Sequence, residues 1–201
     1  MSAPLLKGFP PVVDDHAGVL VLGSFPSAQS LSAGQYYANP RNAFWPIISE
    51  LFAVDADAPY HWRLVALQSH GIALWDVLHQ CRRVGSADSA IDPKSLVVND
   101  FGELFGGYPT ITRVYFNGAK AAELYRRLAL HSDLVHYQRL PSTSPAHVMR
   151  PGAKLAAWQA ISRVDRKRGA AGRSGSAPVD RASITSAAQP GEAGRRQWIT
   201  S

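Results

Sequence analysis

Short runs of β-forming residues alternate along this chain with longer amphipathic stretches, and that alternation limits the fold more than any other feature. It is typical of a parallel sheet covered by helices, because consecutive parallel strands need a crossover connection. The runs with the length and apolar character of buried strands are Val19–Gly23, Ile72–Trp75, Arg113–Phe116 and, more weakly, Leu134–Leu140. Helices are expected at Phe44–Phe52, His61–Ser69, Asp100–Phe105, Ala119–Leu128 and Pro151–Arg163. The sequence therefore predicts an α/β protein, a three-layer sandwich with a central, mainly parallel four-stranded sheet flanked by helices.

Two features of the composition exclude classes of protein. The single cysteine, Cys81, rules out a disulfide framework, a four-cysteine zinc site and a cysteine-ligated iron–sulfur cluster within one chain. The seven histidines show no spacing that compels a ligand set, so no metal is expected. No stretch approaches the roughly 20 apolar residues that span a bilayer, and the first residues lack the apolar block of a signal peptide. We expect a cytoplasmic protein with no membrane partner.

The formal net charge of +6 lies mainly in one segment. From Arg166 to Ser201 the chain has seven basic and two acidic residues, whereas the remainder is nearly balanced. That segment is rich in small and polar residues, so a low-complexity, disordered basic tail is expected at 168–201 and a folded domain at 1–167. The tail either aids solubility or acts as a weak phosphate-attracting arm. Bulk charge alone does not indicate that the domain binds a polyanion.

Polar and glycine-containing segments follow each of the four expected strands. They are GSFPSAQSLSAGQYYANPRN, DVLHQCRRVGSADSAI, NG and PSTSPAH, and we interpret all four as loops. In an open parallel sheet ligands bind outside the carboxyl ends of the strands, so these segments predict a site at that edge. The first segment has neither the spacing and lysine of a P-loop nor the glycine pattern of a dinucleotide fingerprint. Its two tyrosines, two asparagines and arginine suit a nucleobase pocket, because aromatic faces stack on bases and amides recognise base edges. The alternative is a tyrosine-rich loop that packs on its own domain.

Four motifs carry a resemblance to a known family. GSFPSAQSLSAGQYYANPRNAFW, GIALWDVLHQCRRVGSADSAI, VYFNG and LPSTSPAH resemble the hypoxanthine-DNA glycosylases of the uracil-DNA glycosylase superfamily, over most of residues 8–163. The chain is similar, more distantly, to mismatch-specific uracil/thymine glycosylases. Those relatives have an asparagine in the turn where this chain has Phe25, a difference that favours hypoxanthine over uracil or thymine.

The resemblance implies a uracil-DNA glycosylase-like fold and a monofunctional enzyme that needs no cofactor. The enzyme would flip a deaminated base out of DNA, most often hypoxanthine at a deoxyinosine site, and hydrolyse its N-glycosidic bond. DNA containing deaminated bases is then the partner, and a monomer in the bacterial cytosol or nucleoid is expected. Two alternatives stay open: a glycosylase of the same superfamily that prefers uracil or xanthine, and a non-catalytic nucleic-acid binding module.

The resemblance also assigns roles to aromatic and amide side chains. Tyr37 would stack on the flipped base and Phe25 would line the pocket, although either ring could be ordinary core. Asn42 is the first candidate to position the attacking water and Asn39 the second; capping of the following helix is the alternative for Asn42. Asn117, after the third strand, would recognise the base with its amide, or serve only as a turn residue before glycine.

The remaining candidates are hydroxyl and ionisable groups. Ser24 and Ser27, after the first strand, can approach a phosphate with their hydroxyls and backbone N–H groups. The resemblance places Ser142, Ser144 and His147 in a loop that enters the DNA near the lesion and holds phosphates. A sixth position, Asp76, ends the second strand and either makes a turn or stabilises positive charge on the sugar.

Overall fold

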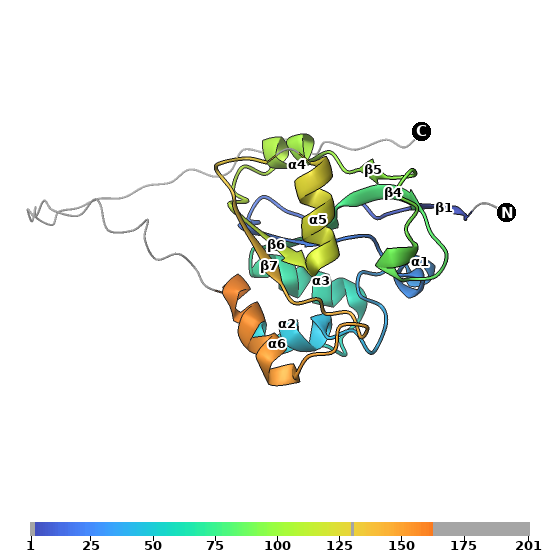
Figure 1. The fold of residues 1–201 in the computed structure, drawn as a ribbon. Helices are drawn as coiled ribbons and strands as arrows, with labels where there is room; N and C mark the ends of the chain where they lie inside the picture. Colours follow the sequence, from blue (N-terminus) through green and yellow to red (C-terminus); the bar gives the residue numbers. More distant parts are fainter. Residues whose placement is uncertain (1–2, 130, 163–201) are drawn as a thin grey trace, which may run out of the picture. The chain divides into compact units, whose positions relative to one another are not determined.

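The computed structural model describes residues 3–129 and 131–162, and Figure 1 shows their arrangement. A four-stranded parallel sheet has the order β3-β2-β6-β7. Its strands are β2 (Val19–Gly23), β3 (Ile72–Asp76), β6 (Arg113–Asn117) and β7 (His136–Leu140). The four predicted strands are confirmed, with β7 beginning at His136 rather than Leu134. The predicted tail at 168–201, and Arg163 at the expected end of the last helix, lie outside the described residues.

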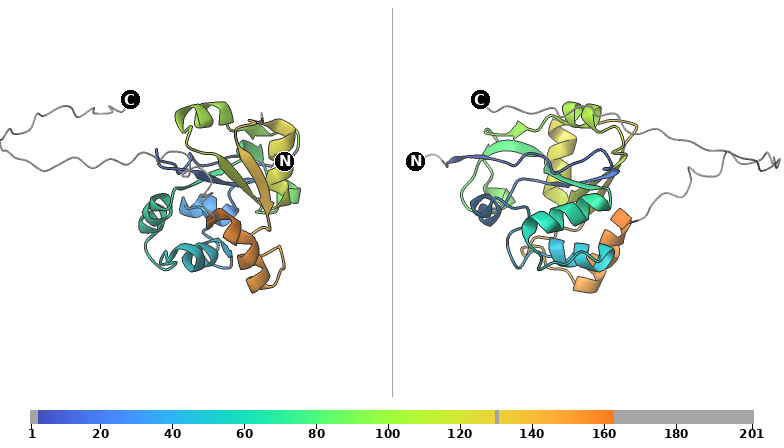
Figure 2. Two further views of the ribbon diagram at one scale, coloured as in Figure 1. Left: turned by 90° about the vertical axis from the view of Figure 1, so that its left-hand side faces the viewer. Right: turned by 180° about the vertical axis from the view of Figure 1, so that it is seen from behind.

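Helices cover both faces of this sheet (Figures 1 and 2). One face carries α4 (Phe101–Gly107) and α5 (Ala119–Leu128). The other carries α2 (Phe44–Phe52), α3 (Tyr60–Ser69) and α6 (Pro151–Trp158), the last continuing as a 3-10 turn at Gln159–Ser162. The predicted three-layer sandwich is therefore confirmed. None of the helices in the described part of the chain is long and apolar enough to cross a membrane.

The central strand β2 is buried along its whole length. Leu20 and Leu22 pack with the core beneath α4 and α5, while Val19 and Val21 pack with the core beneath α2 and α3. A parallel strand covered on both faces needs this continuous apolar run, which is why the sequence signal was strong. The connections place β3 on one side of β2 and β6 on the other, and this switch in direction leaves a crevice at the carboxyl end of β2.

A second, three-stranded antiparallel sheet was not predicted. It consists of β1 (Leu5–Lys7), β4 (Leu78–Arg82) and β5 (Val97–Val98) in the order β1-β4-β5. The interpretation of the whole segment after β3 as a loop is thus wrong, because β4 lies within it. Only Leu78 and Cys81 of β4 are buried, so the strand has no regular two-residue apolar alternation. The first polar segment likewise contains a short helix, α1 (Ala28–Ala33), whose N-cap is Ser27.

Candidate active site

A pocket of about 110 Å³ opens at the carboxyl edge of the parallel sheet. Each of the four strands contributes to it: Gly23 ends β2, Asp76 ends β3, Asn117 ends β6, and Ser142 follows β7. This volume is below the roughly 150 Å³ of a closed cavity that holds benzene, but the pocket is not closed and shares lining residues with a larger groove beside it. The residues that line it are Gly23, Ser24, Phe25, Pro26, Ser27, Ser30, Tyr36, Tyr37, Asn42, Asp76, Ser86, Asp88, Asn117, Ser142, Thr143 and Ser144.

The carboxyl group of Asp76 is held against the backbone of β2. Gly23 pairs with Asp76 in the parallel ladder, and a Cβ added to Gly23 would overlap Asp76 Oδ1. Asp76 is only 4% exposed, and its Oδ2 has no hydrogen-bond partner among the described residues. Burial raises the pKa of this carboxyl to about 8, with a further rise from the nearby charge of Asp88. The side chain is therefore protonated over most of the neutral pH range.

A second carboxylate and a buried arginine lie around Asp76. Ser24 Oγ donates to Asp88 Oδ1 at 2.7 Å, which fixes Asp88 at the rim of the pocket. Arg83 is 1% exposed, donates to the Pro26 carbonyl and lies with its guanidinium carbon 5.1 Å from the centre of the Phe25 ring. Its positive charge lowers the pKa of Asp76, but by less than burial and Asp88 raise it.

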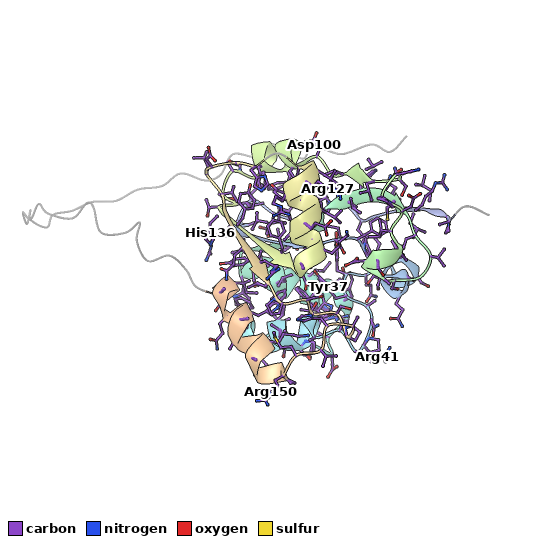
Figure 3. All side chains as sticks on the ribbon, in the orientation of Figure 1. Tyr37, Arg41, Asp100, Arg127, His136 and Arg150 are labelled. Carbon is purple, nitrogen blue, oxygen red and sulfur yellow. The ribbon has the colours of Figure 1, made fainter. Side chains whose placement is uncertain are left out.

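Tyr37 forms an aromatic wall of the pocket, at the lower end of α5 in Figure 3. Its ring stacks on Phe44, with centroids 4.0 Å apart and planes 22° apart. Its backbone is left-handed, with φ 56°, an unusual conformation for a bulky residue. Burial raises the pKa of the Tyr37 hydroxyl and the charge of Asp76 adds to the rise, whereas a hydrogen bond with Asn117 opposes it. Phe25 also lines the pocket while packing in the core, so packing in the core excludes neither ring from the pocket wall.

Asn117 and Thr143 join the end of β6 to the segment after β7. Asn117 Nδ2 donates to Thr143 Oγ1, and the Thr143 N–H donates to Asn117 Oδ1, both at 2.8 Å. The Thr143 carbonyl in turn accepts from the N–H of Ala43, just before α2. Gly118 follows with φ 100°, and a Cβ there would lie 2.9 Å from Ser142 Cβ. These contacts fix three of the segments that surround the pocket.

The two candidate asparagines occupy different places. Asn42 lines the pocket, and its Oδ1 accepts from the N–H of Phe44 at 3.0 Å, in the turn that leads into α2, whose N-cap is Ala43. Asn39 does not line the pocket; its Oδ1 accepts from the N–H of Arg41, and its side chain faces an adjacent groove. Asn42 therefore lies in the pocket and Asn39 outside it, although the sequence ranks the two as first and second candidates for positioning the water.

The adjacent groove continues from the pocket and has a volume of about 490 Å³. The groove shares Ser27, Asn42, Asp88, Ser142 and other lining residues with the pocket, and adds Asn39 and His147. Of the predicted phosphate-binding residues, Ser24, Ser27, Ser142 and Ser144 line the pocket, whereas His147 lines only the groove.

The site also contains residues to which the sequence assigned no firm role. For Asp76 the sequence leaves open a turn or stabilisation of positive charge on the sugar, and it assigns no role to Asp88, Tyr36 or Thr143. The position of Asp76 at the end of a strand is visible in the sequence, but its burial and its closeness to Gly23 and to the charge of Asp88 are not. Within residues 3–129 and 131–162, no group of three or more His, Cys, Asp or Glu side chains could hold a metal ion.

A parallel sheet with this pocket at its carboxyl edge defines a class of protein that the comparisons identify. The family model of the uracil DNA glycosylase superfamily matches residues 10–162, and the chain belongs to that superfamily. It is 35% identical over 161 residues to a hypoxanthine DNA glycosylase of Methanosarcina acetivorans, an alignment that covers 78% of this chain and 98% of the relative. It is 38% identical over 118 residues to one of Methanosarcina barkeri, covering 58% and 73%. The family resemblance predicted from the four motifs is confirmed.

The fold has a solved counterpart. A solution NMR structure from Methanosarcina acetivorans, provisionally described as a uracil DNA glycosylase, superposes with a TM-score of 0.64 at 33% identity. The match covers 80% of this chain and all of that one.

Proposed function

We propose that this protein is a DNA glycosylase that hydrolyses the N-glycosidic bond of hypoxanthine at deoxyinosine sites. The observation that carries the proposal is the pocket itself: it has aromatic rings, amides and hydroxyls on its walls and lies at the carboxyl edge of the parallel sheet, in a chain whose relatives are named hypoxanthine DNA glycosylases. Because such a pocket admits only a base turned out of the stack, the enzyme acts by base flipping.

Tyr37, Phe25 and Asn117 hold the flipped base in this proposal. Base–aromatic stacking contributes roughly 1–3 kcal/mol, which is of the size needed to offset the few kcal/mol of extrusion. One face of Tyr37 is already stacked on Phe44, so the base lies against the other. Asn117 holds Thr143 with both ends of its amide, and the second lone pair of its Oδ1 accepts the N1–H of hypoxanthine.

Asn42 positions the water that attacks C1′ of the sugar. Its Oδ1 accepts one backbone N–H and keeps a second lone pair for a water proton. Asn39, which faces only the groove, is the second candidate. An amide orients water without being a strong base, so catalysis depends on departure of the base and on stabilising an oxocarbenium-like sugar.

The groove holds the DNA backbone on either side of the flipped nucleotide. Hydroxyls and N–H groups of Ser24, Ser27, Ser142 and Ser144 face the phosphates, and His147 lies further along the groove. The exposed arginines Arg41 and Arg150, labelled in Figure 3, belong to the segments before α2 and α6 and supply positive charge nearby. No metal or cofactor takes part in the proposed reaction. In this proposal the protein acts as a monomer and works in the bacterial cytosol, where its DNA substrate lies.

An excision assay tests the proposal. Oligonucleotides that differ only in one deoxyinosine, deoxyuridine or deoxyxanthosine are incubated with the protein, and alkali then cleaves the abasic sites. Fastest release at deoxyinosine is expected. Fastest release of uracil would favour the second candidate, a uracil glycosylase, which the description of the solved relative supports. DNA binding without release from any strand would overturn the enzymatic proposal in favour of a binding module.

A further inference from the structure

The carboxyl group of Asp76 has no part in the mechanism derived so far, although it is a deeply buried ionisable group on the pocket wall. It ends β3, lines the pocket and is nine-tenths or more buried. Its Oδ2 has no partner among the described residues, whereas a buried carboxyl oxygen ordinarily accepts or donates a hydrogen bond. An unpartnered polar atom inside a ligand pocket indicates a group that finds its partner in the ligand.

The groups around Asp76 keep its carboxyl group protonated. The facing ionisable groups are Asp88 at the start of a 3-10 turn after β4, Arg83 directly after β4, and the hydroxyls of Tyr36, Tyr37 and Tyr60. Only Arg83 favours the carboxylate, and its effect is the smallest of the three that act on Asp76. The pKa of about 8 lies where an acid is both protonated at neutral pH and able to release its proton.

We propose that Asp76 is the general acid of the reaction, donating its proton to a ring nitrogen of the departing purine. This inference rests on the proposed function. As the C1′–N9 bond breaks, its electron pair goes to the base, and the Asp76 proton moves to the ring so that neutral hypoxanthine leaves. The attacking water adds its oxygen to C1′ and releases a proton to solvent, from which Asp76 is protonated again. The overall reaction converts deoxyinosine DNA and water into an abasic site and free hypoxanthine.

The carboxylate that remains after proton transfer has a second effect. It lies in the same pocket as the sugar cation that forms when the base departs, and opposite charges attract strongly in a water-poor site. Asp76 is neutral before the bond breaks and becomes an anion as the base leaves. Its side chain therefore stabilises the transition state more than the ground state.

The pH dependence of kcat/KM tests the assignment. With deoxyinosine DNA the wild-type value should fall about tenfold per pH unit above about pH 8, as Asp76 loses its proton. Asp76→Asn keeps the size of the side chain but has no transferable proton, so its rate should be about 10²–10⁴-fold lower and should lack this dependence. Ionisation of the lactam group in the substrate affects every variant in the same way, so it does not account for a difference between their pH profiles. Asp133→Asn, the same change on an exposed residue, is the matched control and should behave as wild type.

A second variant keeps the test informative if Asp76→Asn folds poorly. Asp88→Asn removes the like charge that raises the pKa of Asp76, so the basic limb of the profile should move to lower pH. An unmoved limb in Asp88→Asn, or a wild-type rate and profile in folded Asp76→Asn, overturns the inference.

Modified substrates identify the acceptor atom and separate the two proposals. Wild type should lose activity on 7-deazadeoxyinosine or on 3-deazadeoxyinosine, and Asp76→Asn should cause no further loss on the affected substrate. Normal cleavage of both analogues overturns the general-acid role while leaving the glycosylase function intact. Failure of wild type to release hypoxanthine from deoxyinosine itself overturns the proposed function.

Discussion

Gly23 is the residue at which the smallest change in size should have the largest effect on the pocket. A methyl group there overlaps Asp76 Oδ1, so Gly23→Ala must displace the carboxyl or bend β2. We expect a loss of about 1–3 kcal/mol in the free energy of unfolding and at least a tenfold loss of excision. Denaturant titration and single-turnover assays measure the two effects. Gly18→Ala, at a site with no atom within 4 Å of the added carbon, is the control; an equal effect at both positions would contradict the prediction.

Asn42 combines a turn hydrogen bond before α2 with a place in the pocket, and serine separates the two. Asn42→Ser should keep the bond to the Phe44 N–H, since serine forms the same side-chain turn, while its shorter side chain no longer reaches a water. Stability close to wild type with a rate about 10²-fold lower is expected. Asn42→Ala should lose about 1 kcal/mol of stability as well. Full activity in a stable Asn42→Ser protein would show that the turn hydrogen bond is the only role of Asn42.

Predictability from sequence differs sharply among the residues of the site. Phe25, Tyr37, Asn42 and Asn117 lie in the pocket as the motifs and their positions after strands indicated. The state of Asp76 was not foreseeable, because desolvation comes from segments distant in sequence that pack over it. Composition and spacing report which side chains are near a strand end, but not how much water remains around them.

At the scale of elements, the join between β6 and the segment after β7 rests on Thr143. Thr143→Val keeps the shape of this fully buried side chain but removes Oγ1, leaving one N–H of Asn117 without its acceptor. We expect a loss of about 1–3 kcal/mol of stability together with weaker discrimination among bases, because Asn117 is no longer held in place. Thr110→Val, on an exposed threonine, should change neither quantity. The melting temperature and the ratio of hypoxanthine to uracil release check the prediction.

Elements with a strong repeating pattern were predictable and short ones were not. The boundaries of β2, α2 and α5 agree with the sequence prediction, since each has a clear apolar run or an amphipathic face. The missed elements, β1, β4, β5 and α1, have three, five, two and six residues. Such elements form because long-range pairing and a cap stabilise them, and local propensity alone does not indicate them.

At the scale of the whole molecule, the buried acid makes stability depend on pH. The folded protein holds the Asp76 proton up to about pH 8, whereas the usual aspartate pKa is 3.8. The folded state therefore binds more protons than the unfolded state between these values, and the free energy of unfolding from this group falls as pH rises from about 4 to about 8. Relative to wild type, Asp76→Asn should gain about 4 kcal/mol of stability between about pH 5 and about pH 9, because about three pH units of linkage at about 1.36 kcal/mol each separate the two conditions. Guanidinium titrations at both pH values measure the difference, and a difference that does not grow with pH would contradict the prediction.

In this parallel sheet, the segments that determine which base is accepted are separate from the strands that hold them in place. Backbone hydrogen bonds set the positions of the strand ends, with Gly23 beside Asp76 and Asn117 beside Leu140, whatever side chains follow them. A lineage can thus exchange one connecting segment at a time and alter the accepted base without rebuilding the framework. Grafting the segment after a single strand from a relative with another preference is accordingly the shortest route to a redesigned enzyme.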